Sequence, residues 1–315
     1  MIPTKARTAV IALGGNALSP SGERATAANQ FRHTRASLAP IVDLAMEGWN
    51  LCVVHGNGPQ VGDALLRNEI AGAEVEPLPL GLLVAATGGW IGYMIQQSLG
   101  NALRRAGSNR DVVSIITQVE VAQDDPALEN PTKFIGHDLP EERARSLERA
   151  GETVREVDGR FRRVVGSPLP LAVHELRVIR PLVESGTIVI ACGGGGVPVY
   201  RDDKLGLEGI DAVVDKDLAA AALARGLAAN LFMILTDVDA VYSDFGTDGQ
   251  RAFAELTVGE AERLDAAGAF GEGSMAPKVR AAVDYVRHTK GRAIITELAS
   301  GRNAVRGAAG TTILP

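Results

Sequence analysis

The sequence predicts an α/β fold in which helices cover both faces of a mainly parallel, open sheet. Strand-like and helix-like patterns alternate to the end of the 315 residues, which is typical of crossover connections. The strand-like runs are apolar without alternation, as expected for strands buried on both faces. Only residues 119–170 break this pattern, with dense charge and no long apolar strand. We therefore predict one domain over residues 1–315 with a small protruding subdomain inserted in it.

Seven apolar, β-branched runs predict the strands, and seven longer amphipathic or alanine-rich segments predict the helices between them. The expected strands are residues 9–13, 51–54, 112–117, 188–192, 231–235, 293–296 and 311–314. The expected helices are residues 26–47, 59–71, 90–105, 171–185, 216–225, 258–267 and 276–290. Pro59 and Pro277 stand near the first turn of their helices, where proline is well tolerated.

Residues 77–103 contain no charged side chain and are long enough to cross a bilayer. Prolines and glycines interrupt the first half, and polar side chains fill the second. We therefore expect a loop followed by the helix 90–105, buried either in the core or in a subunit interface. Trp90, Tyr93 and Met94 are large enough to act as interface anchors in the second case.

The charged residues 119–170 are interpreted as a lid, which we define by these bounds. Residues 159–166 (Gly-Arg-Phe-Arg-Arg-Val-Val-Gly) have the pattern of an amphipathic hairpin strand within it. The alternative is a solvated surface excursion without a role in the site.

The charge and cysteine content exclude some classes of protein. A net charge of −6 argues against a partner that is a nucleic acid or a membrane surface, since either would need a basic patch. Cys52 and Cys192 both lie in expected strands, away from any ligand-like spacing. They are expected to be buried thiols in a reducing compartment. With no signal peptide expected, we predict a cytoplasmic protein.

Three of the expected strands end abruptly in glycines. Leu13 is followed by Gly14-Gly15-Asn16, Val54 by His55-Gly56-Asn57-Gly58, and Cys192 by Gly193 to Gly196. Glycine lets the backbone turn and approach a ligand closely. The carboxyl ends of parallel strands meet at one edge of a sheet, where ligands usually bind. The sequence therefore predicts a site made mostly of backbone N–H groups, which suits phosphate or carboxylate.

Two lysines stand at expected helix starts, where a cation is electrostatically unfavourable. Lys216 lies between Asp215 and Asp217, and Lys278 follows Pro277. Helix capping explains either aspartate, but it does not explain the lysines. A bound anion explains both, and two lysines with an aspartate suit phosphoryl transfer, which rests on positioning and charge neutralisation.

Two further places carry candidate side chains. Asp237 and Asp239 follow the strand 231–235 and could bind a metal or a ribose, or simply form the turn. Lys133 lies in the lid and is either a surface lysine or a group that reaches over a substrate. His55 is expected to hydrogen-bond the glycine turn, with a catalytic role as the less favoured alternative. A P-loop, a zinc-type histidine pair and a nucleophile elbow are not found in the sequence.

Taken together, these residues resemble the amino-acid kinase superfamily and, within it, the carbamate kinase branch. The resemblance covers essentially the whole chain. Its most specific motifs are residues 55–62 (His-Gly-Asn-Gly-Pro-Gln-Val-Gly), 131–133 (Pro-Thr-Lys), 192–196 (Cys-Gly-Gly-Gly-Gly), 215–217 (Asp-Lys-Asp) and 273–278 (Gly-Ser-Met-Ala-Pro-Lys).

This resemblance implies a three-layer αβα sandwich that forms a homodimer. It implies phosphoryl transfer between ATP and carbamate with Mg²⁺, generally run from carbamoyl phosphate and ADP towards ATP. Lys216 and Lys278 would flank the γ-phosphoryl group, Asp217 would hold both lysines, and Lys133 would reach over from the lid. The implied phosphate and carbamate cradle is the backbone of Gly14, Gly15, Asn16, Gly56, Asn57, Gly194 and Gly195. The implied nucleotide border is Thr236, Asp237, Val238, Tyr242, Met275 and Pro277. The sequence does not indicate the Mg²⁺ ligands.

The chain departs from the branch in the lid. Phe134 and His137 stand where proline is usual, and so does Gly166. Two other functions therefore remain open: a sister kinase of another small carboxylate or phosphate, and a nucleotide-binding regulatory or storage protein without turnover.

Overall fold

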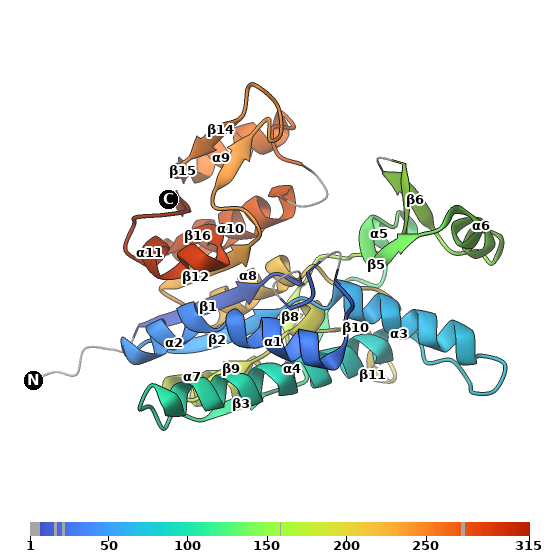
Figure 1. Cartoon of the computed structure of the whole chain (residues 1–315), viewed down its shortest axis with the longest axis horizontal. Helices are drawn as coiled ribbons and strands as arrows, with labels where there is room; N and C mark the ends of the chain where they lie inside the picture. The colour runs from blue at the N-terminus through green and yellow to red at the C-terminus, as the bar shows by residue number, and fades with distance from the viewer. Residues whose placement is uncertain (1–6, 16–17, 21–22, 158, 272–274) are drawn as a thin grey trace, which may run out of the picture.

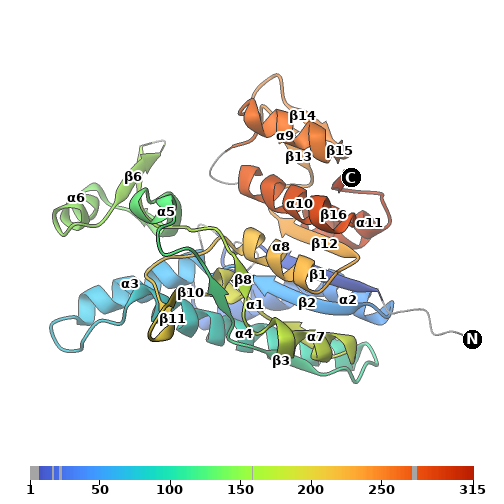
Figure 2. The ribbon, with the colours of Figure 1, turned by 180° about the vertical axis from the view of Figure 1, so that it is seen from behind.

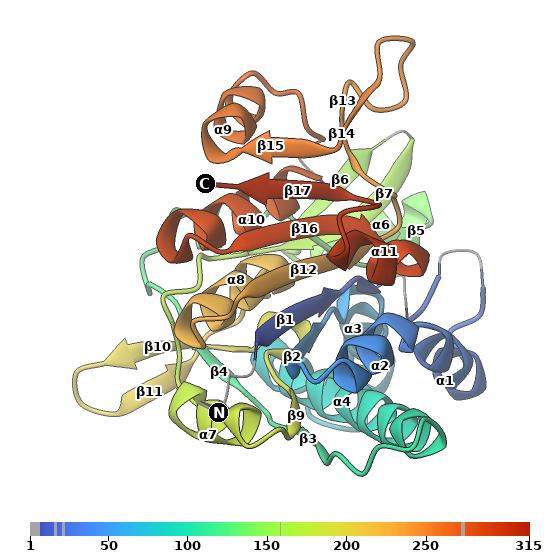
Figure 3. The same ribbon diagram turned by 90° about the vertical axis from the view of Figure 1, so that its left-hand side faces the viewer.

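An eight-stranded central sheet forms the middle layer of the molecule (Figures 1 and 3). The computed structural model describes residues 7–15, 18–20, 23–157, 159–271 and 275–315. The strand order is β15-β17-β16-β12-β1-β2-β9-β3. The strands are β1 (Thr8–Leu13), β2 (Asn50–His55), β3 (Val112–Ser114), β9 (Ile188–Ile190), β12 (Leu231–Thr236), β15 (Glu255–Thr257), β16 (Arg292–Glu297) and β17 (Thr311–Leu314).

The sheet is mainly parallel, as the sequence predicts. In the centre, β1 pairs in parallel with both β2 and β12, so that Ala12 lies opposite Val54 on one side and Ile234 on the other. The pairing of β16 with β17 is antiparallel, because α11 and a short loop return the chain directly beside β16. The glycine-containing turns after β1, β2 and β9 consequently lie at one edge of the sheet.

Helices cover both faces of the sheet, which gives the three-layer sandwich (Figures 1 and 2). Successive residues of β1 alternate between two cores: Val10 and Ala12 face one, and Ala9, Ile11 and Leu13 face the other. The first core contains α7 (Leu176–Glu184), α8 (Lys216–Gly226), α9 (Val258–Ala266) and α10 (Met275–Thr289). The second contains α2 (Ala39–Met46), α4 (Leu80–Arg105) and α11 (Gly301–Val305), and α1 (Ala27–Ala36) packs at its edge.

Three smaller sheets lie outside the central one. A four-stranded sheet has the order β11-β10-β4-β8, and a two-stranded sheet pairs β13 with β14. A third sheet, β5-β7-β6, forms with α6 a unit that projects from the body next to α3 (Figures 1 and 2). The bounds are β4 (Gln118–Glu120), β5 (Lys133–Leu139), β6 (Val154–Val157), β7 (Arg160–Val165), β8 (Ala172–Val173), β10 (Val197–Asp202), β11 (Gly206–Gly209), β13 (Val241–Ser243), β14 (Arg251–Phe253), α3 (Gly58–Ala71), α5 (Pro126–Glu129) and α6 (Glu141–Arg149).

Two expected helices differ in extent. The helix expected over 26–47 is two helices, α1 and α2, because Pro40 at the start of α2 cannot continue the first. The loop expected up to residue 89 is helical, and α4 begins at Leu80. Its glycines are tolerated because the helix packs closely, with Gly88 against the backbone of Gly193. Among the described residues, no helix, α4 included, is both long enough and apolar enough to span a membrane.

The other differences concern short segments. The strand expected over 112–117 ends at Ser114, and the chain then enters β4 of a different sheet. The helix expected over 171–185 begins only at Leu176, after β8. Cys52 and Cys192 are free and fully buried, and burial raises the pKa of the Cys52 thiol to about 12.

Candidate active site

The glycine turns after β1, β2 and β9 form the floor of the site. A Cβ built on Gly56 would lie 3.1 Å from the Gly15 nitrogen and 3.2 Å from Cδ of Lys216. A Cβ built on Gly194 would lie 2.3 Å from Nδ2 of Asn57. A side chain would not fit at Gly194 and would be tightly confined at Gly56. These approaches bring three segments that are far apart in the sequence into one place. Gly14 also belongs to this floor, whereas Asn16 lies outside the described residues.

Lys216, Asp217 and Lys278 meet beside this floor. Nζ of Lys216 lies 2.6 Å from Oδ1 of Asp217, and Nζ of Lys278 lies 3.5 Å from its Oδ2. Lys216 and Asp217 open α8, and Lys278 stands in the first turn of α10. The two helices pack side by side (Figure 2), so one carboxylate can hold both ammonium groups.

Burial makes it unfavourable for both lysines to carry a positive charge so close together. Only 2% of the Asp217 side chain is exposed. Burial lowers the pKa of Lys216, and the charge of Lys278 lowers it further, while Asp217 opposes both effects. The pair of lysines therefore favours any anion that adds negative charge between them.

Lys133 pairs with Asp215, a contact that sequence reasoning did not predict. Asp215 caps α8 by accepting hydrogen bonds from the nitrogens of Asp217, at 2.8 Å, and Leu218, at 3.3 Å. Its other oxygen accepts a charge-assisted hydrogen bond from Nζ of Lys133 at the start of β5. The sequence identified Asp215 only as a cap, and nothing local indicates a partner 82 positions away.

The same pair sets the ionisation of both groups. Burial alone would raise the pKa of Asp215, but the charges of Lys133 and Lys216 outweigh it and hold that pKa well below its usual range. Burial likewise lowers the pKa of Lys133, and Asp215 more than compensates, so that it is raised. Both groups are therefore charged at neutral pH.

His55 is buried under the glycine turns and is neutral. Burial lowers its pKa to about 4, against smaller opposing effects of the Gly56 and Gly88 carbonyls. Its Nδ1 lies 3.0 Å from the Gly56 oxygen, so the ring hydrogen-bonds the turn, as the sequence predicted. This environment suits a positioning role for the ring rather than that of a base at neutral pH.

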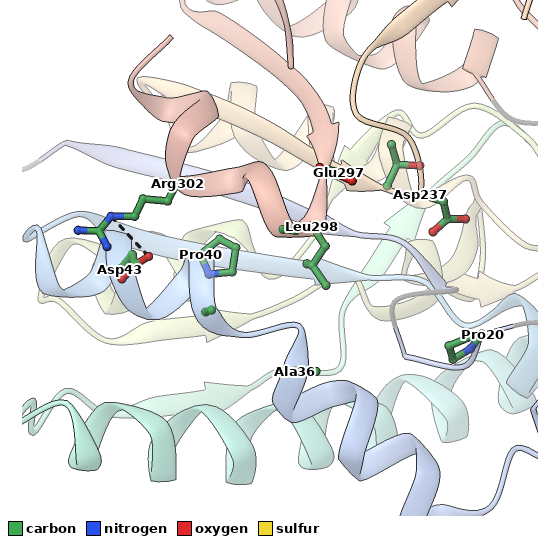
Figure 4. Close-up of a pocket in the computed structure, with 11 residues that line it drawn as sticks. Pro20, Ala36, Pro40, Asp43, Asp237, Glu297, Leu298 and Arg302 are labelled. Atoms are coloured by element: carbon green, nitrogen blue, oxygen red, sulfur yellow. Dashed lines mark ion pairs between the residues drawn. The ribbon is translucent and has the colours of Figure 1, made fainter. Parts of the chain in front are cut away.

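The residues expected to border a nucleotide are not all gathered in one cavity. A cavity of about 650 Å³ at the ends of β12 and β16 is lined by Thr236 and Asp237. Figure 4 shows Asp237 at one end of it and the ion pair of Arg302 with Asp43 at the other. Val238, Tyr242, Met275 and Pro277 do not line this cavity. Met275 and Pro277 belong to α10, which covers the opposite face of the sheet. The nucleotide border therefore stays a prediction.

The three lid residues that differ from the carbamate kinase pattern, Phe134, His137 and Gly166, each make a close contact in the structure. Phe134 lies under the Arg162 guanidinium, 5.1 Å from the ring centroid. Nε2 of His137 lies 3.4 Å from Oδ1 of Asp63 on α3. A Cβ on Gly166 would lie 3.1 Å from Cα of Leu128. The contacts of Phe134 and Gly166 lie within the lid, whereas His137 links the lid to α3.

The described residues hold no cluster of three or more His, Cys, Asp or Glu side chains suited to a metal ion. Both oxygens of Asp217 already contact lysines. The side chains described here therefore do not by themselves fit a magnesium cage.

A substitution at Gly195 tests whether the glycine turns pack against their neighbours as closely as the structure shows. The φ of Gly195 is +96°, and an added Cβ would lie 2.0 Å from the Val214 carbonyl oxygen, which cannot move aside. We expect Gly195→Ala to lower the free energy of unfolding by about 3 kcal/mol. Gly206→Ala, with φ +87° and open space around it, should cost only about 1 kcal/mol. Urea unfolding compares them, and equal losses would contradict the close approach.

Comparison with known proteins places this chain in a family. The profile described as "Amino acid kinase family" matches residues 7–297. The carbamate kinase of Pyrococcus furiosus is 43% identical over 97% of this chain and 98% of its own length. That of Halobacterium salinarum is 45% identical over the same shares. The structure of Giardia lamblia carbamate kinase bound to AMP-PNP matches with a TM-score of 0.90 and 36% identity, over 98% of each chain. The chain therefore belongs to the amino acid kinase family and, within it, groups with the carbamate kinases.

Proposed function

We propose that this kinase transfers a phosphoryl group reversibly between ATP and carbamate, and that it works mainly from carbamoyl phosphate and ADP towards ATP. One observation carries the proposal: Asp217 holds Lys216 and Lys278 together beside the glycine floor. The near full-length similarity to carbamate kinases supports the choice of substrate.

The proposed chemistry rests on charge and position. Lys216 and Lys278 would neutralise the oxygens of the phosphoryl group in flight, and backbone N–H groups of the floor would orient it. The attacking oxygen of carbamate is already anionic, so the reaction needs no general base. A neutral, buried His55 is consistent with that requirement.

Mg²⁺ is proposed as the metal that accompanies the nucleotide. Mg²⁺ prefers few protein carboxylates and binds largely through phosphate oxygens and water, so the nucleotide itself would supply most of its ligands. The ion would supply further charge neutralisation on the phosphates.

A coupled assay tests the function directly. The purified protein is given ADP and carbamoyl phosphate, and ATP formation is measured, with acetyl phosphate as the matched donor control. We expect ATP from carbamoyl phosphate only. Preference for another acyl phosphate would indicate a sister kinase. Nucleotide binding without exchange would indicate a regulatory or storage protein.

Lys133 is proposed to reach carbamoyl phosphate from the lid. Lys133→Ala should raise the KM for carbamoyl phosphate roughly 10–100-fold, the value of one charge-assisted hydrogen bond, with a smaller effect on the KM for ADP. Lys133→Arg, which keeps the charge, should restore part of the loss. Equal changes in both KM values would contradict the assignment.

The Lys133→Ala substitution should also change how the free energy of unfolding depends on pH. Because the pKa of Asp215 is depressed in the folded state, its pairing stabilises the protein above the ordinary aspartate pKa and is lost as the pH falls. The stability difference between wild type and Lys133→Ala should therefore shrink below about pH 4, as urea unfolding at several pH values would show.

We further propose a cytoplasmic homodimer. Helix α4 presents two exposed apolar side chains, Leu82 and Tyr93, the latter 55% exposed, while Met94 is buried in the core. Such side chains are favourable anchors at a subunit interface. Sedimentation of wild type and Tyr93→Lys tests the assembly, and a monomeric wild type would refute it.

A further inference from the structure

A cleft of about 780 Å³ lies at the amino-terminal edge of the central sheet. It is formed where β1, β12 and β16 begin and where α8 and α10 end, and Pro315 lines its rim. Figure 3 shows the starts of these strands on the side where the C-terminus lies. The glycine floor lies at the opposite edge of the sheet, so this cleft is separate from the candidate active site.

The cleft is strongly basic in a chain whose net charge is −6. Five side chains that can be positive line it: Arg7, Arg225, His288, Lys290 and Arg292. Asp284 contacts two of them. The cations would still outnumber the carboxylates if Pro315 carried a free carboxylate.

Several of these cations are held in place. Nη1 of Arg225 lies 3.3 Å from Oδ1 of Asp284, and Nδ1 of His288 lies 3.2 Å from the same oxygen. Nη2 of Arg292 donates to the Val305 carbonyl at 2.8 Å. The Arg7 guanidinium lies 4.2 Å from the centroid of the Trp49 ring. A ligand would therefore meet charges whose side-chain entropy is already partly lost.

Helix capping accounts for only part of this charge. Arg225 and His288 lie in the last turns of α8 and α10, where cations suit the helix dipole. Arg7, Lys290 and Arg292 lie outside helices. Lys290 also adopts φ +59°, a conformation that costs energy in a side chain other than glycine or asparagine. Helix dipoles therefore do not explain why these three cations gather in the cleft.

A second feature of the cleft, independent of its charge, is the indole N–H of Trp49, which is unpaired among the described residues. Trp49 lines the cleft, and only 3% of it is exposed. An indole N–H can only donate, and buried donors are normally paired. One wall of the cleft therefore carries a residue with a buried donor that has no partner among the described residues.

We propose that this cleft is a second binding site, for a small polyanion that carries phosphate groups or several carboxylates. Guanidinium groups bind both through paired N–H donors. The site goes beyond the phosphoryl transfer proposed above and does not depend on it.

Trp49 can report on the site directly, because the chain contains only one other tryptophan, Trp90. In the Trp90→Phe protein, Trp49 fluorescence is titrated with pyrophosphate and, separately, with citrate. The buffer contains no Mg²⁺ and has a constant ionic strength set by KCl, so that general screening is the same throughout. We expect a saturable change with at least one probe, and the responding probe identifies the ligand as a phosphate or a polycarboxylate.

Matched variants separate this site from others. Lys290→Asn removes a charge and keeps a residue that tolerates positive φ. Combined with Arg292→Gln, it should weaken probe binding at least about tenfold. Arg287→Gln removes an equal charge from the last turn of α10, where Arg287 pairs with Glu262 and does not line the cleft. It should leave binding within about twofold, a difference of less than 1 kcal/mol.

Three results would overturn the proposal. One is no saturable change with either probe up to about 10 mM, well above the Kd of a weak small ligand. Another is unchanged binding in the double variant, which would place the anion in the active site. The third is equal weakening by Arg287→Gln, which would indicate general charge attraction. If the double variant does not fold, judged by its thermal unfolding, Lys290→Asn alone decides the comparison.

Discussion

Lys278→Ala should lower kcat roughly 10²–10⁴-fold, the range seen when one group that stabilises transition-state charge is removed. Lys278 stands in the first turn of α10 and lies 3.5 Å from Asp217. Without it, one of the two ammonium groups beside the glycine floor is missing when charge spreads over the phosphoryl oxygens. Steady-state ATP synthesis from carbamoyl phosphate and ADP measures the loss.

Arg287→Ala is the matched control for this variant. Arg287 lies on the same helix, pairs with Glu262 at the surface and should be replaceable without loss of turnover. If Lys278→Ala retained near-normal kcat, the proposed role of Lys278 would be wrong. A loss confined to the KM for ADP would instead assign Lys278 to nucleotide binding.

Asp217→Asn should impair both lysines at once. The amide keeps the shape of the side chain but leaves Lys216 and Lys278 without the carboxylate that holds them. We expect kcat to fall at least about 10²-fold, since misplacement by as little as 1 Å has that effect. Because Asp217 opposes the lowering of the Lys216 pKa, its loss should lower that pKa further. Activity in the variant should therefore decline at a lower pH than in the wild type.

The pH–rate profile of Asp217→Asn distinguishes a lowered Lys216 pKa from general damage to the fold. Asp284→Asn is the control, because Asp284 also lies between two cations, Arg225 and His288, but at the far end of α10. It should keep the wild-type alkaline limb. An Asp217→Asn profile with an unchanged alkaline limb would show that Asp217 does not tune Lys216.

The sequence predicted the central sheet well because the physical signal is local. Apolar runs such as Ile188–Ile190 cannot stay exposed, and they end where glycine permits a turn. The position of Lys216 and Lys278 at helix starts was informative for the same reason, since cations are disfavoured there unless an anion is present. Their common contact with Asp217 follows from how α8 and α10 pack.

Features that depend on tertiary contacts could not be read from the sequence. The start of α4 at Leu80 was missed because local propensity treats glycine as a helix breaker, whereas Gly88 lets α4 pack closely on Gly193. The hairpin of β10 and β11 is short and only half-buried, so its periodicity is weak. The pairing of Lys133 with Asp215 joins two units that no sequence pattern connects.

Lys216 and Lys278 each stand where a helix presents the positive end of its peptide dipoles. Two ammonium groups and two helix amino-terminal ends therefore place positive potential in one region. Among the residues that the structure describes, Asp217 is the one buried carboxylate in contact with both lysines. A phosphate bound between the two lysines, as proposed, would relieve this repulsion, so part of its affinity would come from the placement of charge in the fold. Substrate binding and the repulsion between Lys216 and Lys278 would then be two aspects of the same placement of charge.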